Sequence, residues 1–290
     1  MTTDTLAYYP GCLAEETARE YDASIRTLCR ALEIELDEID DWNCCGAGVV
    51  RDVNPAAAEA LARRVLDAAG TGRTVVSGCP VCVRRLQEAG GSAYHVLSVF
   101  ARQDVRERIR AKIEAKGEAR PLGSMKAACF YGPELADAAL WETAADDEAW
   151  PMDVLMTLAG AKVIRWGGSR RSAGGYLLFA KPETGFEMLG KIFRDFEKSG
   201  ADAIVTADPH AHFNLDVFQY EIGRRRKRAL DVPVLHFTEV LALAMELEPT
   251  ERWLERHVTG TLPLIDRLCI EEDKRLEAEK KAAKRKKETG

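Results

Sequence analysis

The sequence has no long apolar run and no excess of basic charge. Its 290 residues carry 41 basic and 47 acidic side chains, a net charge of −6, so the overall charge gives no reason to expect nucleic-acid binding. Aromatic residues make up 7% of the chain and none interrupts the basic run Arg224–Arg228, which argues against stacking on bases. No apolar stretch is long enough to cross a bilayer, and residues 1–10 lack a charged and then apolar leader. We therefore expect a cytoplasmic protein without a membrane span.

Cysteine is not scarce, and its distribution is the most informative feature of the chain. Five of the eight cysteines form one pattern: Pro10-Gly11-Cys12, Cys44-Cys45-Gly46 and Cys79-Pro80-Val81-Cys82, with thirty-one residues between Cys12 and Cys44 and thirty-three between Cys45 and Cys79. In a reducing compartment, clustered cysteines are typical of metal ligands or redox groups and not of disulfides. Thiolates are preferred ligands of iron–sulfur clusters and soft metals. Cys29 and Cys269 lie in helix-like apolar patterns, where we expect buried free thiols.

Two other interpretations of the pattern stay open. A structural zinc site would use four thiols and leave one spare, because zinc takes four ligands. A thiol pair can also carry out exchange chemistry without a metal, but Cys79 and Cys82 would be enough for that. The surplus of thiols therefore favours an iron–sulfur cluster.

The chain repeats one order of elements twice. Each half has a strand-like run, two helical patterns and a second strand-like run, at residues 6–9, 15–32, 56–69 and 74–76 in the first half and 127–131, 152–158, 183–198 and 203–206 in the second. Strands that alternate with amphipathic helices predict an α/β fold. We expect two tandem pseudo-repeated α/β lobes with mainly parallel sheets, residues 1–118 and 119–248, and a basic helical or disordered tail at 249–290. The join is placed in the polar stretch Lys116–Lys126.

The two halves differ at the positions of the candidate ligands. When the repeats are aligned, the five cysteines of the first half correspond to Pro133, Ser172, Ala173, Asp208 and Ala211. Cys129 lies four residues before the position that corresponds to Cys12, so it is not counted as a ligand. The sequence therefore predicts one thiolate site, in the first lobe, and a second lobe that has none.

This arrangement resembles the CCG domain of the B-type subunit of heterodisulfide reductase and of related subunits in sulfur-oxidising and quinone-linked complexes. The resemblance extends over about 6–247 of the chain. It implies one noncubane [4Fe-4S] cluster, held through five cysteines: Cys12, Cys44, Cys45, Cys79 and Cys82. The archetype of the family has two such sites and cleaves a disulfide between them, whereas a single site resembles the sulfur-oxidising version. The implied role is that of an iron–sulfur oxidoreductase subunit that transfers electrons, carries out disulfide or persulfide redox chemistry, or both.

The resemblance also implies partners. These are a ferredoxin-like iron–sulfur subunit and a flavin-binding subunit of the same complex, with a second B-type subunit and a lipoyl carrier protein in some versions. Two alternatives remain: a non-catalytic electron-relay or scaffold subunit, and a subunit of a lactate- or glycolate-oxidising complex. An open coordination face would favour the catalytic role, and a cluster sealed beneath a partner would favour relay.

The second lobe offers cations in place of thiols. If the repeat geometry holds, Arg170, Arg171 and His210 approach its emptied pocket, where they can bind a carboxylate or an acidic carrier surface. The alternative is a degenerate lobe kept as a scaffold. His95 and His236 occupy equivalent positions just after strands, and we expect both to be structural histidines with satisfied hydrogen bonds. The Arg224–Arg228 run is expected to end a helix, and the chain from Glu271 to form a solvated helix that frays.

Overall fold

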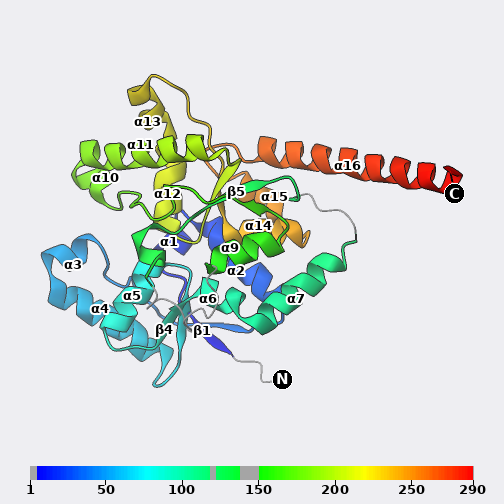
Figure 1. Cartoon of the computed structure of the whole chain (residues 1–290). Helices are drawn as coiled ribbons and strands as arrows, with labels where there is room; N and C mark the ends of the chain where they lie inside the picture. Colours follow the sequence, from blue (N-terminus) through cyan, green and yellow to red (C-terminus); the bar gives the residue numbers. More distant parts are fainter. Residues whose placement is uncertain (1–4, 118–121, 138–149, 290) are drawn as a thin grey trace.

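The computed structural model describes residues 5–117, 122–137 and 150–289. The predicted lobe boundary between residues 118 and 119 lies outside these ranges. The described strands form two four-stranded sheets, in the order β2-β1-β3-β4 and β6-β5-β7-β8, and every neighbouring pair is parallel. Helices alternate with the strands in both halves (Figure 1). The predicted class, two tandem α/β lobes, is confirmed.

The first lobe carries the cysteine motif at the ends of its strands. Its elements are β1 (Leu6–Tyr8), α1 (Cys12–Glu15), α2 (Arg19–Ala31), β2 (Leu36–Glu38), α3 (Val49–Val53), α4 (Pro55–Ala69), β3 (Val75–Ser77), α5 (Pro80–Glu88), β4 (Ala93–His95), α6 (Val96–Ala101) and α7 (Gln103–Glu114). Helix α4 starts sharply because the Asn54 side chain accepts a hydrogen bond from the backbone N–H of Ala57 and Pro55 fits the first helical turn. This start fixes where the chain turns after the Cys44-Cys45 loop.

The second lobe repeats this order. Its elements are β5 (Lys126–Phe130), α8 (Gly132–Leu135), α9 (Pro151–Leu158), β6 (Lys162–Val163), α10 (Leu177–Ala180), α11 (Pro182–Ser199), β7 (Ala203–Thr206), α12 (Pro209–Val217), α13 (Gln219–Arg226), β8 (Val234–His236), α14 (Phe237–Ala244), α15 (Thr250–Leu254) and α16 (Leu262–Thr289). The basic run does end a helix: α13 stops at Arg226, and Lys227 has a left-handed backbone with φ of 52°.

The lobes pack through reciprocal helix contacts. Helix α2 of the first lobe contacts α14 of the second, and α6 of the first contacts α9 of the second. Because α2 corresponds to α9 and α6 to α14 in the repeat, the interface has a pseudo-two-fold relation. The largest hydrophobic core lies here, with Ile25, Phe100 and Phe237 all buried within it. Each lobe also has a smaller core on the far side of its sheet.

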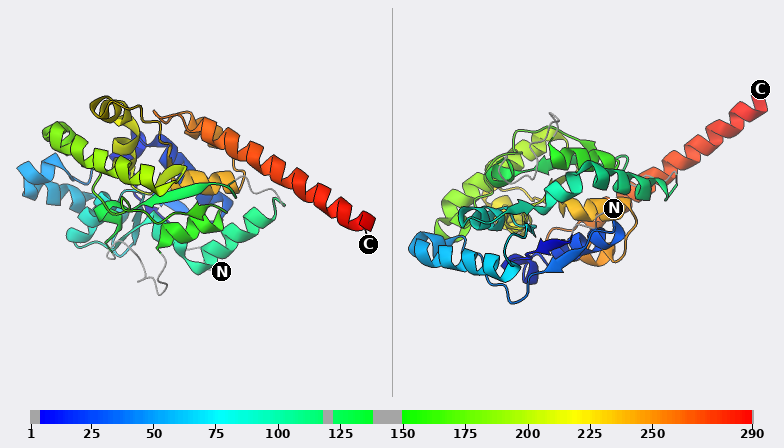
Figure 2. Two further views of the ribbon diagram at one scale, coloured as in Figure 1. Left: turned by 45° about the horizontal axis from the view of Figure 1, so that its top comes forward. Right: turned by 90° about the horizontal axis from the view of Figure 1, so that it is seen from below.

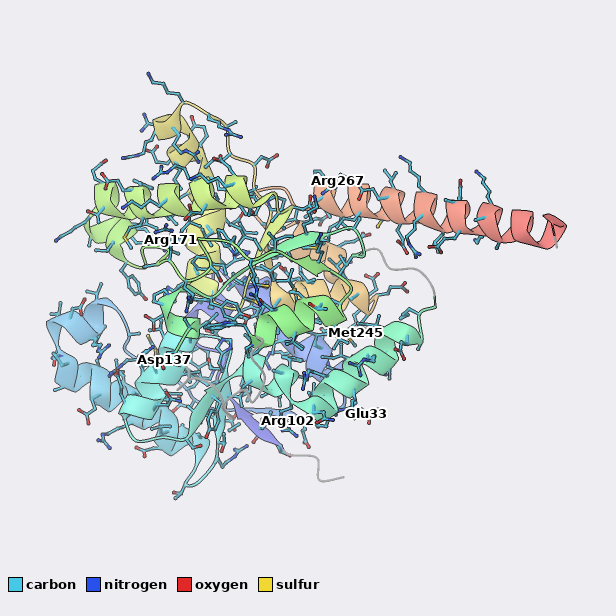
Figure 3. The ribbon with its side chains drawn as sticks, in the orientation of Figure 1. Glu33, Arg102, Asp137, Arg171, Met245 and Arg267 are labelled. Carbon is cyan, nitrogen blue, oxygen red and sulfur yellow. The ribbon has the colours of Figure 1, made fainter. Side chains whose placement is uncertain are left out.

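Three local expectations differ from the structure. The helix expected over 15–32 is divided into α1 and α2, because the chain turns at residues 16–18. The C-terminal segment is one helix, α16, that starts at Leu262 and projects from the body of the molecule (Figure 2). Cys269 lies on an exposed face of this helix, so the expectation that it is buried was wrong. Near the start of α16, Arg267 pairs with Asp202 at 2.9 Å and anchors the helix to the second lobe (Figure 3).

Candidate metal centre

Three separate segments bring five thiols into one pocket. Cys12 follows β1, Cys44 and Cys45 lie in the loop after β2, and Cys79 and Cys82 follow β3. Parallel strands end at one edge of a sheet, which is where α/β folds place their ligands. All five cysteines line the same cavity, and the Sγ atoms of Cys45 and Cys82 are 3.2 Å apart. Cys12 and Cys44 are exposed and the other three are buried. One side of the group of thiols is therefore open to solvent.

Gly46 sets the position of the Cys44-Cys45 turn. Its φ is +75°, and a Cβ at this position would lie 2.9 Å from the Cα of Ala58, closer than Cβ atoms come in real structures. Only glycine allows both this backbone conformation and this approach to α4. Gly11, with φ of +78°, faces the Sγ of Cys82, which would lie 3.5 Å from a Cβ there. Both glycines therefore have a backbone conformation that other residues rarely adopt, and at Gly46 the close approach to α4 also excludes a side chain.

Backbone donors surround the sulfurs. The N–H groups of Gly46 and Ala47 donate to the sulfurs of Cys44 and Cys45. The N–H of Cys82, in the first turn of α5, donates to the sulfur of Cys79. Such donors stabilise negative charge on sulfur and, around a cluster, raise its reduction potential.

The thiols strongly influence one another's protonation. Hydrogen bonds from Cys12 and Cys45 lower the pKa of Cys44 to about 2, and a hydrogen bond from Cys82 lowers the pKa of Cys79. The hydrogen bond with Cys44 raises the pKa of Cys12, and those with Cys45 and Cys79 raise the pKa of Cys82. Five thiolates cannot share this pocket without a compensating positive charge. The donor set therefore fits a cationic metal or iron–sulfur group that replaces the protons.

Two residues of the second lobe complete the pocket. Tyr176 and His210 line it beside the five cysteines, with ring centroids 5.3 Å apart in an edge-to-face arrangement. Burial alone would lower the pKa of His210, but its hydrogen bond to Cys79 and the charge on that sulfur raise it to about 9. Tyr176 packs on Gly48, where a Cβ would lie 2.4 Å from its ring. The first lobe's site is therefore closed on one side by the second lobe.

The three predicted cationic residues lie in three different environments. His210 faces the cysteines of the first lobe. The Nε of Arg171 pairs with the carboxylate of Asp195 at 2.6 Å in the second lobe, where Figure 3 labels Arg171. Arg170 lies over the ring of Trp150 at 5.7 Å and lines a separate cavity of about 960 Å³. The structure does not bring these three residues together in one pocket.

Sequence reasoning missed Tyr176 and the cavity that contains Arg170. Tyr176 corresponds in the repeat to Gly48, the residue on which it packs. A large side chain opposite a glycine is a recognisable signal only when the two lobes are known to face each other. The cavity near Arg170 is also lined by Arg106, Arg110 and Arg165. These arginines come from α7 and from the loop after β6, which are distant in sequence.

The comparisons with known proteins agree with the cysteine motif. The family profile CCG, described as a cysteine-rich domain, matches residues 6–87. The chain is 27% identical over 289 residues to the 8-methylmenaquinol:fumarate reductase membrane anchor subunit of Wolinella succinogenes, covering 89% of this chain and 98% of that protein. It is 22% identical over 296 residues to the B-type subunit of the ferredoxin:CoB-CoM heterodisulfide reductase of Methanosarcina mazei, covering 91% of this chain and 96% of that protein. Among the helices that the structure describes, none is both long and apolar enough to span a membrane.

A solved structure supports the fold over nearly the whole chain. A hypothetical protein from Helicobacter pylori superimposes with a TM-score of 0.63 at 11% sequence identity. The match covers 90% of this chain and 53% of that one, so this chain spans about half of the length of the solved structure. The CCG match falls on the lobe that holds all five clustered cysteines, and the heterodisulfide reductase match extends over both lobes. Residues 6–87 therefore form a CCG cysteine-rich domain, and the chain as a whole is similar in sequence to the B-type subunit of heterodisulfide reductase.

Proposed function

We propose that the five cysteines hold one noncubane [4Fe-4S] cluster and that the chain is an iron–sulfur redox subunit of a heterodisulfide reductase-like complex. The observation that carries the proposal is the convergence of five thiols in one pocket, with two Sγ atoms 3.2 Å apart. A tetrahedral zinc site uses four ligands and would leave one of these thiols without a role. Such a cluster, when bound, supplies one-electron redox chemistry at sulfur.

The residues around the pocket support a catalytic role on a disulfide or persulfide. The exposed Cys12 and Cys44 mark the side from which a sulfur substrate can approach. His210, which hydrogen-bonds the Cys79 sulfur, holds its imidazole beside this pocket, and Tyr176 covers part of it. These two groups orient a substrate and donate hydrogen bonds to developing charge on its sulfur. The alternative, relay without substrate, requires a partner that covers the same exposed side.

An apolar rim beside the pocket supports the proposed partner subunits. Val49 and Val53 on α3 are 62% and 78% exposed, and Phe179 on α10 is 66% exposed. The contact of Tyr176 with Gly48 holds the starts of these two helices together beside the cysteines. Exposed apolar groups gathered at one place mark interaction surfaces. A ferredoxin-like subunit docked on this rim would lie close to the cluster for electron transfer. The flavin-binding subunit and the carrier protein stay predictions.

One of the relatives suggests a quinol as an alternative electron donor or acceptor. The Wolinella succinogenes protein is a subunit of a methylmenaquinol:fumarate reductase, so a quinol-linked complex is an alternative setting for the same cluster. Activity with a disulfide or persulfide in the absence of quinone would separate these settings.

The first experiment is the iron and acid-labile sulfide content of the full chain purified without oxygen, with electron paramagnetic resonance of the same sample. We expect about four irons and four sulfides per chain, in line with one cluster of this type, and loss of both in Cys45→Ser. Cys29→Ser is the matched control, since this buried thiol lies outside the pocket. Eight irons would contradict the single site. Zinc without iron would refute the redox function.

We also infer that the cavity of about 960 Å³ binds an organic anion. Its lining includes Arg106, Arg110, Arg165 and Arg170 together with Trp150. Among the described residues, none of these four guanidinium groups forms an ion pair. Arginine suits carboxylate and phosphate groups, and the volume is that of a small-molecule site.

A further inference from the structure

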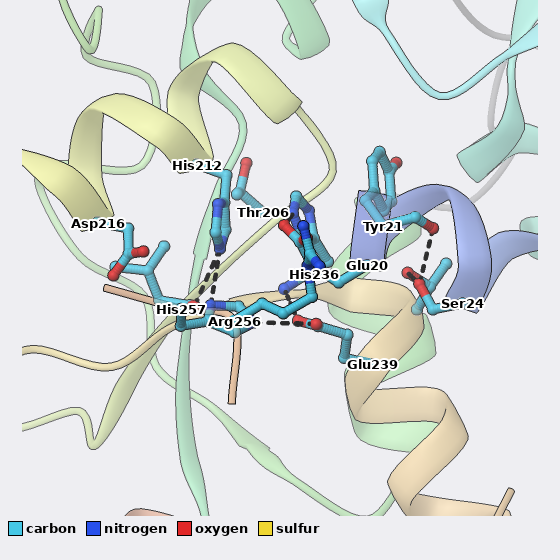
Figure 4. Close-up of polar contacts among 12 residues, drawn as sticks. Glu20, Tyr21, Ser24, Thr206, His212, Asp216, His236, Glu239, Arg256 and His257 are labelled. Carbon is cyan, nitrogen blue, oxygen red and sulfur yellow. Dashed lines mark hydrogen bonds and ion pairs between the residues drawn. The ribbon is translucent and has the colours of Figure 1, made fainter. Parts of the chain in front are cut away.

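Three buried imidazoles meet where the two lobes join. His212 lies on α12, His236 ends β8, and His257 lies in the loop after α15. All three are less than 9% exposed, and three carboxylates surround them: Glu20, Asp216 and Glu239. Figure 4 shows that these side chains come from separate segments, with the imidazoles of His212 and His257 in contact and Asp216 to one side, where its oxygens accept hydrogen bonds from the N–H groups of Val258 and Thr259. None of the six lines the cysteine pocket, so the cluster proposed above does not explain this group.

His257 has the two contacts that are typical of a histidine bound to a metal: one ring nitrogen faces a carboxylate and the other faces a possible ligand. Its Nε2 lies 2.9 Å from Oε1 of Glu239, and its Nδ1 lies 3.1 Å from Nε2 of His212. A histidine that binds a metal commonly donates its other ring N–H to a carboxylate, which fixes the ring. Zinc–nitrogen bonds of about 2.0–2.1 Å place two tetrahedral nitrogen ligands roughly 3.3–3.4 Å apart. The two imidazole nitrogens, which form a hydrogen bond in this structure, are therefore spaced nearly as two ligands of one ion would be, and Nε2 of His212 also lies 3.2 Å from the carbonyl oxygen of Val234.

His236 is the clearest anomaly of the group. It is fully buried, and among the residues that the structure describes neither of its ring nitrogens has a well-formed hydrogen bond, although the ring lies beside the backbone N–H of Glu239. Its closest carboxylate oxygen, Oε1 of Glu20, is 4.0 Å from Nε2. The equivalent histidine of the first lobe, His95, has both nitrogens engaged, with the carbonyl of Gly78 and the N–H of Leu97. The expectation that both histidines are satisfied is therefore met for His95 but not for Nε2 of His236, a buried nitrogen without a hydrogen-bond partner among the described residues.

The candidate ligand atoms form two overlapping sets of three. One atom each from Glu20, His212 and His236 lies within 4.8 Å of the others, and the same holds for His212, Asp216 and His257. His212 belongs to both sets and so is the common member.

We propose that this group is a second metal site, in which His212, His257 and Asp216 bind one Zn²⁺ and His236 completes the coordination. The rings of His212 and His236 are stacked with centroids 3.9 Å apart at 20°, so His236 must tilt before its nitrogen can face the ion. Glu239 is the outer partner of His257, and Glu20 is held by Arg256 at 3.1 Å. The site joins α12, the end of β8 and the loop after α15 within the second lobe, and its role is to hold these three segments together. This proposal does not depend on the iron–sulfur cluster.

The test uses the full chain, purified without oxygen and then treated with Zn²⁺ alone in competition with a chromogenic chelator. We expect one zinc per chain, with only nitrogen and oxygen neighbours in its X-ray absorption spectrum. His257→Gln should lose this zinc while it keeps its iron, and His236→Leu should bind zinc more weakly, with about tenfold lower affinity. His95→Gln is the control and should keep the zinc, because its histidine holds the equivalent position in the other lobe.

Several results would overturn the proposal. Wild-type protein that takes up no zinc would show that the imidazoles form a hydrogen-bonded network without a metal. Zinc with sulfur neighbours would place the ion at the cysteines. Unchanged zinc in His257→Gln would exclude the proposed ligand set. The wild-type titration decides the matter even if a variant does not fold, and iron content reports separately on the cluster.

Discussion

Replacement of Gly46 by alanine gives the sharpest test of how the backbone positions the cysteines. The residue has φ of +75°, which costs an L-residue about 1–2 kcal/mol. The added Cβ would also lie 2.9 Å from the Cα and 3.0 Å from the O of Ala58. Both of these atoms belong to backbone, so the loop itself must shift. Overpacking of this kind costs about 1–3 kcal/mol more.

A matched control separates the two effects. Gly72 has nearly the same φ, +77°, but a Cβ there would meet nothing within 4 Å. Gly72→Ala should therefore lose only the conformational part, about 1–2 kcal/mol. Gly46→Ala should lose roughly 2–5 kcal/mol in total, from both sources. It should also displace Cys45, the residue before it, and so reduce the iron content.

Urea or thermal unfolding of both variants, with iron analysis of the same samples, measures these effects. For a domain of 150–250 residues each kcal/mol shifts Tm by about 2–4 °C, so the two variants should be clearly resolved. If Gly46→Ala and Gly72→Ala lost equal stability and both kept full iron, the close approach of the turn to α4 would not be what positions Cys45.

Three further predictions concern other parts of the molecule. Burial lowers the pKa of His95 to about 4, so the unfolded chain binds a proton that the folded chain does not. Stability should therefore fall by about 2 kcal/mol between pH 7.5 and 5 from this group, and urea unfolding of His95→Gln should show a smaller fall. The Oγ of Ser24 and Oγ1 of Thr238 are 2.6 Å apart across the lobe interface. Ser24→Ala should cost about 1–3 kcal/mol by leaving the hydroxyl of Thr238 without its partner, and adding Thr238→Val should recover part of this loss in the same assay. Arg165→Ala and Arg170→Ala should each weaken citrate binding in calorimetry by about tenfold to a hundredfold, since a hydrogen bond to a charged group contributes about 1.5–3 kcal/mol; unchanged affinity would contradict the anion site.

The sequence predicted the features that depend on local pattern. Strand-helix alternation gave both lobes and the parallel sheets, and β7 has the bounds expected, Ala203–Thr206. The convergence of the cysteines followed from a physical rule, since the ends of parallel strands meet at one edge. The first helix was predicted too long, because the apolar spacing of α2 does not reveal the turn at residues 16–18.

What the sequence did not predict depends on how the lobes face each other. His210 was expected at the second lobe's own pocket, and the structure places it at the cysteines of the first. The same packing leaves the ring nitrogens of His236 without a well-formed hydrogen bond in the described part of the chain, although its repeat equivalent has two. Neither outcome follows from composition or periodicity, because both are set by contacts between segments more than a hundred residues apart.

The contact between Tyr176 and Gly48 has a consequence for how such chains evolve. These residues hold the same position in the two repeats, so they meet close to the axis that relates the halves. A duplicated copy that has lost its ligands is then free to change its own pocket but cannot be deleted. Its loops form a wall of the surviving site, and its helices bury the shared core. In proteins that descend from such a duplication, we expect the copy without a cluster to replace its cysteines by side chains that line the other copy's site. Both copies are expected to keep their full length.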